Sequence, residues 1–162
     1  MTNAPKTVLA IHDLPGFGRA ALSVIVPVLS TLGVQTVALP TAVLSTHTGG
    51  LGTPAKLANP GYGPAALEHY HRLGVKFDCI YSGYLADAAQ AKLVEQAFEL
   101  WPRAFKVVDP VLGDGGRLYS GLGADMADGG TAGGAGERAV GDQGHGAVDP
   151  LVTADGLGGH QL

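Results

Sequence analysis

Apolar runs rich in β-branched residues alternate with helical segments through the first 108 residues of this 162-residue chain. Strands are predicted at residues 7–12, 34–39, 77–82 and 104–108, and helices at about 19–31, 65–73 and 88–100. Gly33 and Gly74 are expected to end the first two helices, and Asp87 is expected to cap the third. Strands and helices in alternation indicate an α/β fold, with a parallel sheet and flanking helices.

Polar side chains follow every predicted strand. The richest group is the stretch Pro40 to Gly50, interpreted as a loop in which Gly49 and Gly50 let the backbone approach a bound molecule closely. The others are Asp13 after the first strand, Ser82 and Tyr84 after the third, and Asp109 and Asp114 after the fourth. Because the carboxyl ends of parallel strands share one edge, these groups are expected to form a site for a small polar molecule. The two carboxylates at the fourth strand would also suit Mg²⁺ and phosphate oxygens.

The composition changes abruptly after residue 120. Residues 1–120 hold all the Phe, Tyr and Trp residues, whereas residues 121–162 hold 13 of the 26 glycines and six acidic residues against one arginine. Such a segment has too few large apolar groups to offset the entropy cost of ordering it. We therefore expect residues 1–120 to form the folded part and residues 121–162 to be a disordered, glycine-rich tail.

Charge and cysteine content narrow the possible partners and compartment. The formal net charge of -4 disfavours nucleic acid as a partner. No apolar run is long enough for a transmembrane helix, so no membrane association is expected. The first residues lack the layout of a signal peptide, and Cys79 is the single cysteine, which favours a reduced, cytoplasmic protein.

One motif points to a different class of function. Residues 16–21 match the pattern G-x-G-x-x-A between a predicted strand and helix, which is typical of dinucleotide-binding oxidoreductases. That fingerprint also needs an acidic residue at the end of the second strand, where this chain has Leu39 and Pro40. The dinucleotide hypothesis is therefore disfavoured.

Four motifs together resemble the pyridoxal/pyridoxamine kinases of the ribokinase-like superfamily. They are Ala-Ile-His-Asp-Leu-Pro-Gly-Phe-Gly-Arg (10–19), Leu-Pro-Thr-Ala-Val-Leu-Ser-Thr-His-Thr-Gly-Gly (39–50), Tyr-Ser-Gly-Tyr (81–84) and Val-Val-Asp-Pro-Val-Leu-Gly-Asp (107–114). They occur in the family's order over residues 7–119, which corresponds to the N-terminal portion of a family member.

The resemblance implies roles for six residues. Asp13, His47, Thr48 and Tyr84 would bind the substrate, Asp109 would lie near the ATP phosphates, and Asp114 would lie near Mg²⁺. The implied activity is transfer of the ATP γ-phosphoryl group to the 5′-hydroxymethyl of pyridoxal, pyridoxamine or pyridoxine. Members of this family are often homodimers.

The resemblance stops near Met126. The family's catalytic base lies far downstream in a Gly-Thr-Gly-Asp turn, and this chain has neither that turn nor the family's Asn-x-x-Glu stretch. We therefore expect no turnover and no catalytic residue within this chain, and our hypothesis is that the sequence is a frameshifted or mis-called fragment. The alternatives are a hydroxymethylpyrimidine or sugar kinase of the same superfamily, and a small-molecule-binding remnant without catalysis.

Overall fold

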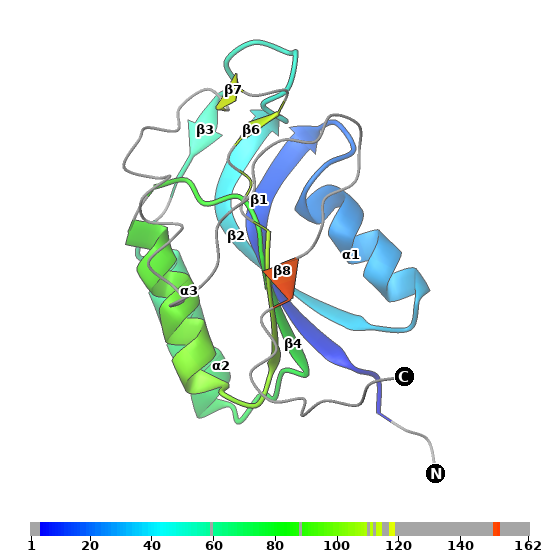
Figure 1. Cartoon of the computed structure of the whole chain (residues 1–162), viewed down its shortest axis with the longest axis vertical. Helices are drawn as coiled ribbons and strands as arrows, with labels where there is room; N and C mark the ends of the chain where they lie inside the picture. The colour runs from blue at the N-terminus through cyan, green and yellow to red at the C-terminus, as the bar shows by residue number, and fades with distance from the viewer. Residues whose placement is uncertain are drawn as a thin grey trace, which may run out of the picture.

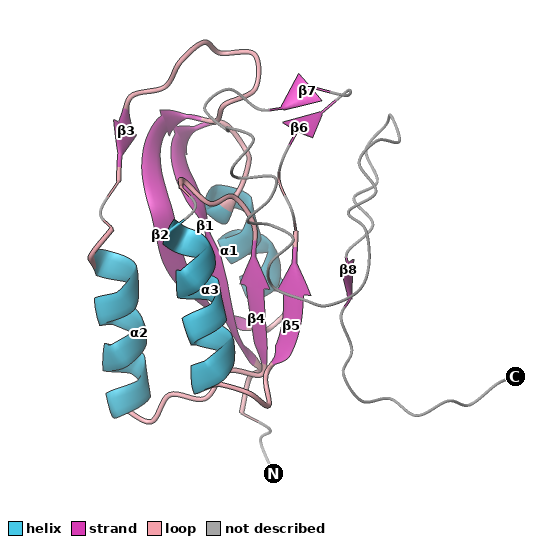
Figure 2. Cartoon of the chain, turned by 60° about the vertical axis from the view of Figure 1, so that its left-hand side comes forward, coloured by secondary structure: helices cyan, strands magenta, loops and turns pink. Residues whose placement is uncertain are grey.

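The computed structural model describes residues 4–58, 60–87, 89–109, 111, 113–114, 117–118 and 151–152. They form a mostly parallel sheet with helices on both faces (Figures 1 and 2). Its strands are β1 (Thr7–Phe17), β2 (Gln35–Thr46), β3 (Lys56–Leu57), β4 (Cys79–Ser82), β5 (Phe105–Val108) and β8 (Leu151–Val152). The helices are α1 (Leu22–Thr31), α2 (Tyr62–Arg72) and α3 (Ala89–Leu100), and β6 (Gly113–Asp114) pairs with β7 (Arg117–Leu118) in a separate ribbon.

The strand order in the main sheet is β3-β2-β1-β4-β5-β8. The four central strands, β2, β1, β4 and β5, are all parallel, as the alternating pattern predicts. The short strands β3 and β8 pair antiparallel at the two edges. The carboxyl ends of the four central strands therefore meet at one edge of the sheet, which we call the ligand edge.

The hydrophobic core lies between the sheet and the pair α2 and α3. Leu9, Ile11, Leu39 and Ile80 project from three neighbouring strands and are fully buried there. They alternate with residues that face α1, which packs on β1 and β2 from the other side (Figure 2). Each fully buried Leu or Ile contributes about 1.5–3 kcal/mol through removal from water, so this layer holds the helical pair against the sheet.

Three helix boundaries are set by the residues that the sequence predicts for them. Gly33 and Gly74 follow α1 and α2 with φ of 78° and 69°, a conformation that glycine adopts without strain. In both, the glycine N–H and the next N–H donate to carbonyls of the last turn, which is the Schellman pattern. Asp87 caps α3, because its Oδ1 accepts from the Gln90 N–H at 3.1 Å.

β1 and β2 are longer than predicted, which corrects two expectations. β1 continues through the residues expected to form a turn, and β2 continues past Pro40 through the first half of the expected loop. The two strands extend each other: after a register shift between His12 and Leu14, pairing resumes and runs to Phe17 and Thr46. Pro40 is tolerated because β3 pairs only with Val43 and Leu44 and does not reach it.

Two helix starts also differ from the prediction. α1 begins at Leu22 and not near residue 19, because Gly18 and Ala21 have positive φ. α2 begins at Tyr62, earlier than predicted, with Pro64 in its first turn, where the missing N–H costs no helical hydrogen bond.

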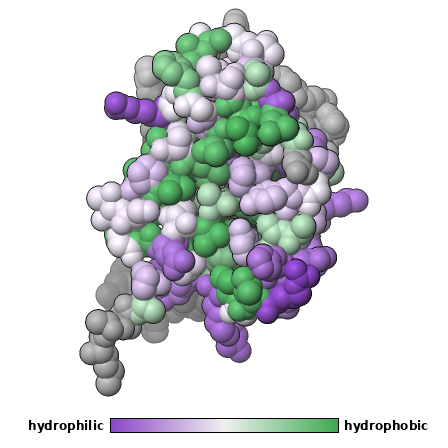
Figure 3. Space-filling view, turned by 180° about the vertical axis from the view of Figure 1, so that it is seen from behind, coloured by the Kyte–Doolittle hydropathy of each residue, from purple (hydrophilic) through white to green (hydrophobic). Residues whose placement is uncertain are grey.

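Residues 20–55 contain no Asp, Glu, Lys or Arg. Their exposed large hydrophobic side chains are Val28, Leu32, Val43 and Leu51. On the face opposite to that of Figure 1, hydrophobic and hydrophilic residues are mixed over the surface (Figure 3). Polar side-chain chemistry in this part of the chain therefore rests on hydroxyl groups, the imidazole of His47 and the amide of Gln35.

The predicted disordered tail lies outside the described residues, apart from the two residues of β8. Within the described ranges, none of the helices has the length and apolar character needed to cross a membrane.

Candidate functional site

Four buried or half-buried side chains are linked across the ligand edge, and we call them the inner cluster: His12, Asp13, Tyr81 and Asp109. His12 Nδ1 lies 2.6 Å from Asp13 Oδ1, and both side chains are buried. The His12 ring stacks on the Tyr81 ring with centroids 6.0 Å apart. The Tyr81 hydroxyl donates to Asp109 Oδ2 at 3.2 Å. The inner cluster thus joins the middle of β1 to the carboxyl ends of β4 and β5.

The backbone makes room for this cluster at two points. Asp13 lies at the register shift of β1, where the strand departs from regular pairing with β2. Gly83 lies directly after β4, and a Cβ there would overlap the His12 imidazole. The Asp109 N–H donates to the Ser82 carbonyl at 2.8 Å and continues the β4–β5 pairing by one step. Small backbone features therefore position these polar side chains.

Tyr84 follows β4 at the ligand edge, and hydrogen bonds hold its backbone in place. The Thr41 hydroxyl donates to the Tyr84 carbonyl at 2.8 Å, and Gln90 Nε2 donates to the Thr41 carbonyl at 2.8 Å. Gln90 Oε1 also accepts from the Ala86 N–H at 2.6 Å. Because Thr41 and Gln90 are buried, this network pins the loop after β4 to β2.

The inner cluster shapes the acidity of the neighbouring tyrosines. Burial, followed by the charge of Asp109 and the hydrogen bond to it, raises the pKa of Tyr81 strongly. Burial and then the charge of Asp13 raise the pKa of Tyr84. Both phenols therefore remain protonated at neutral pH, and the Tyr81 hydroxyl is the one that donates, to Asp109, among the described residues.

His47 and Thr48 form a second group at the far end of the β1–β2 ribbon, and with Gly18 we call them the outer cluster. The His47 N–H donates to the Phe17 carbonyl at 3.1 Å, and a Cβ on Gly18 would overlap the His47 ring. His47 Nδ1 accepts from the Gly49 N–H at 3.2 Å. His47 and Thr48 are both half-buried.

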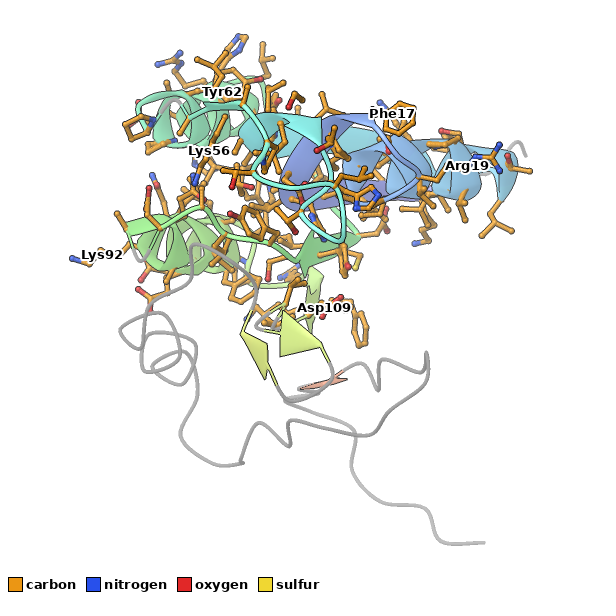
Figure 4. The ribbon with its side chains drawn as sticks, turned by 90° about the horizontal axis from the view of Figure 1, so that it is seen from above. Phe17, Arg19, Lys56, Tyr62, Lys92 and Asp109 are labelled. Atoms are coloured by element: carbon orange, nitrogen blue, oxygen red, sulfur yellow. The ribbon has the colours of Figure 1, made fainter. Side chains whose placement is uncertain are left out.

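The predicted site residues therefore reach the same edge but at two levels. Asp13, Tyr84 and Asp109 lie near the ends of the short strands, and His47 and Thr48 lie beyond the ends of the long ones. Viewed from above, Phe17 lies over the β1 side while Asp109 lies beside the β6–β7 ribbon (Figure 4). Asp114 belongs to β6, and its side chain lies outside the described residues.

Sequence reasoning gave no site role to three residues that the structure connects to the site. They are His12, Tyr81 and Gln90. His12 precedes Asp13 directly, and Tyr81 opens the motif that ends in Tyr84, so adjacency was a usable signal for both. Gln90 acts across a separation of 49 residues from Thr41, and no local pattern indicates that contact.

The structure removes the local context of the dinucleotide motif. Gly16 lies within β1 and not in a strand-to-helix turn, and a Cβ there would lie 3.3 Å from the Ser45 carbonyl oxygen of β2. The glycine therefore faces a neighbouring strand, whereas the fingerprint needs it beside a pyrophosphate.

A groove also lies between the N-terminal ends of α2 and α3. Pro40, Pro60, Pro64, Leu93 and Gln96 line part of it. It carries none of the residues predicted for the site.

The fold matches solved kinase structures. A Bacteroides thetaiotaomicron protein assigned as a phosphomethylpyrimidine kinase, in a crystal form with pyridoxal, has a TM-score of 0.74 and 40% identity over 78% of this chain and 44% of its own. The Lactobacillus plantarum pyridoxal kinase has a TM-score of 0.71 and 37% identity over 77% and 45%. The Leishmania donovani pyridoxal kinase in complex with ADP has a TM-score of 0.62 and 22% identity over 76% and 44%.

The chain spans less than half the length of these structures. No known protein-family profile matches it, and no curated protein matches it in sequence. The shared fold and the 37–40% identity to two of these kinases nevertheless confirm the predicted resemblance. The described part of this chain therefore has the fold of the N-terminal portion of pyridoxal kinase-like proteins of the ribokinase superfamily.

Proposed function

We propose that this chain derives from a kinase that phosphorylates the 5′-hydroxymethyl group of a B6 vitamer, with ATP as the phosphoryl donor. The observation that carries the proposal is the 37–40% identity to two kinases, one of them named a pyridoxal kinase and the other crystallised with pyridoxal. The polar ligand edge supports it, because a pyridine ring with hydroxyl groups needs short-range donors and acceptors around it.

In this proposal the vitamer lies over the inner cluster. Asp13 accepts a hydrogen bond from a substrate hydroxyl or a protonated ring nitrogen, and Tyr84 closes the pocket beside it. His47 and Thr48 of the outer cluster line the opposite end. Asp13 and Tyr84 are more than nine-tenths buried, so polar contacts to them would be well shielded from water.

The phosphate end would lie at β5. In the part of the chain that the structure describes, no three His, Cys, Asp or Glu side chains are grouped so as to hold a metal ion. Mg²⁺ usually takes only one or two protein carboxylates and completes its shell with phosphate oxygens and water, so Asp109 fits that requirement. We propose that Asp109 lies near the ATP phosphates and Asp114 near Mg²⁺, which would neutralise charge on the transferred group.

A second substrate has a specific observation in its favour. The Bacteroides thetaiotaomicron protein is assigned as a phosphomethylpyrimidine kinase, so a hydroxymethylpyrimidine is the alternative acceptor. Both acceptors are six-membered nitrogen rings with a hydroxymethyl group, and the inner cluster can donate to and accept from either.

Calorimetry with the purified 162-residue chain separates these possibilities. We expect pyridoxal to bind weakly and hydroxymethylpyrimidine to bind more weakly still. The reverse order would favour the pyrimidine kinase, and no binding of either would favour a remnant without this function.

A turnover assay tests the expected inactivity. With ATP, Mg²⁺ and pyridoxal, the chain should form no phosphorylated product above a control without protein. The loss of a general base typically lowers a rate by about 10²–10⁴. Turnover that survives a second purification would overturn this expectation and would make Asp109 the first residue to substitute.

A further inference from the structure

His12 makes contacts beyond those that packing alone would require. Its Nδ1 lies 2.6 Å from Asp13 Oδ1 and 3.0 Å from the Asp13 backbone nitrogen. Tyr81 stacks on one side of the ring, and Gly83 leaves the space that the ring fills. The imidazole is therefore held in one orientation by three neighbours and is directed at one oxygen of one carboxylate.

The short distance between the two side chains has a chemical consequence. Two lone pairs would repel at 2.6 Å, so one proton must lie between Nδ1 and Oδ1. Whichever atom carries that proton, Oδ1 is committed to the imidazole. Among the described residues, no donor is bonded to Oδ2, so that oxygen is the one available to a ligand.

We propose that His12 is a positioning residue that fixes the Asp13 carboxylate and presents its Oδ2 to a hydrogen-bond donor of the ligand. The inference rests on the proposed function, because it takes the B6 vitamer as the ligand. It adds a selection rule: the ligand must place a hydroxyl or a protonated ring nitrogen at Asp13, since an acceptor there would face a fixed carboxylate oxygen.

The Tyr81 ring connects the two ends of the proposed site. Tyr81 contacts His12 by stacking and Asp109 through its hydroxyl, so the orientation of His12 and that of Asp109 depend on one side chain. A change at His12 should therefore disturb Asp13 most and Asp109 less.

Two substitutions separate positioning from packing, because the two roles predict opposite orders. His12→Phe keeps the aromatic ring but removes Nδ1, whereas His12→Asn removes the ring but keeps a donor near the Nδ1 position. If His12 positions Asp13, His12→Phe should weaken pyridoxal binding about tenfold, the cost of losing a hydrogen bond to a charged group, and His12→Asn should recover most of it. His71→Phe is the control, because His71 packs edge-on against Trp101 within the helical layer.

Two results would contradict the proposed role of His12. Binding to His12→Phe within twofold of the unsubstituted chain, or weaker binding to His12→Asn than to His12→Phe, would overturn the positioning role.

A measurement without ligand keeps the inference testable if a variant fails to fold or the vitamer fails to bind. In the chain that keeps His12, Asp13→Asn should shift the ring ¹⁵N resonances of His12 and leave those of His71 unchanged. Unchanged His12 resonances would overturn the shared proton. If those resonances shift while the unsubstituted chain binds no pyridoxal, the proposed function is wrong. The role of Asp13 in binding the vitamer is then wrong too, but the positioning of its carboxylate by His12 is still supported.

Discussion

The inner and outer clusters lie on the same edge of the sheet but are built differently. The inner cluster is linked by side-chain hydrogen bonds and ring stacking between three strands, and its His12 and Asp13 are buried. The outer cluster is half-buried and is held by two hydrogen bonds, from the His47 N–H to the Phe17 carbonyl and from the Gly49 N–H to His47 Nδ1. The inner cluster is thus part of the packed protein, and the outer cluster belongs to a projecting ribbon.

Because of this difference, substitutions in the two clusters should affect stability and ligand binding to different degrees. A change in the inner cluster should alter stability and ligand binding together, because the same contacts serve both. A change in the outer cluster should alter binding with a smaller effect on unfolding. Three substitutions test this comparison.

Gly83→Ala should have the largest effect. Its Cβ would overlap the buried His12 ring, and overpacking of this kind typically costs about 1–3 kcal/mol of unfolding free energy. Gly49→Ala is the matched control, because neither Gly49 nor Gly83 has a positive φ and a Cβ at Gly49 would meet its nearest atom at an ordinary 3.5 Å. Urea unfolding measures both. If Gly83→Ala binds pyridoxal normally and is no less stable than the parent chain, the inner cluster does not couple stability to binding as the comparison requires.

Asp13→Ala should weaken pyridoxal binding by roughly 1–3 kcal/mol, because it leaves a ligand donor without its acceptor. Titration calorimetry gives the value, and Thr48→Ala provides the comparison from the outer cluster. The proposed place of the vitamer over the inner cluster would be wrong if Thr48→Ala weakened binding while Asp13→Ala had no effect.

Tyr81→Phe should have a smaller effect that depends on pH. Loss of the hydrogen bond to Asp109 should cost about 0.5–1.5 kcal/mol of unfolding free energy near neutral pH. Burial raises the pKa of Tyr81 above the unfolded value of 10.0, so the folded protein holds this proton more tightly. The resulting stability is present below about pH 10 and is lost as the pH rises beyond it.

The variant should therefore lose less stability than the parent chain between neutral pH and about pH 10.5. Some loss should remain, because the pKa of Tyr84 is raised as well. Urea unfolding at both pH values measures the difference. Equal losses in the two proteins would show that Tyr81 does not carry this dependence.

The sequence predicts most of the fold because the deciding features are local. Gly33, Gly74 and Asp87 set helix boundaries through their own backbone or side-chain chemistry, and all three predictions are confirmed. The lengths of β1 and β2 were missed because each strand is extended by pairing with the other. That contact joins segments about 30 residues apart, and turn-forming residues such as Pro15 and Pro40 conceal it in the sequence.

The site was predictable only as a set of strand ends. Parallel topology places Asp13, His47, Tyr84 and Asp109 at one edge, but it does not predict the two levels, which follow from the longer strands. The links through His12 and Tyr81 depend on the register between β1 and β4 and on the space at Gly83. Three-dimensional packing decides those features.

Amide chemical-shift mapping with pyridoxal tests the central claim most directly. If the ligand edge is a B6 vitamer pocket, pyridoxal should perturb the amides of Asp13, Thr48 and Tyr84, and NAD should perturb none of them. Gly16→Ala should leave the pyridoxal response unchanged, because that glycine faces Ser45 of β2. Perturbations confined to the α2–α3 groove around Leu93 and Gln96, or an NAD response that Gly16→Ala abolishes, would contradict the account.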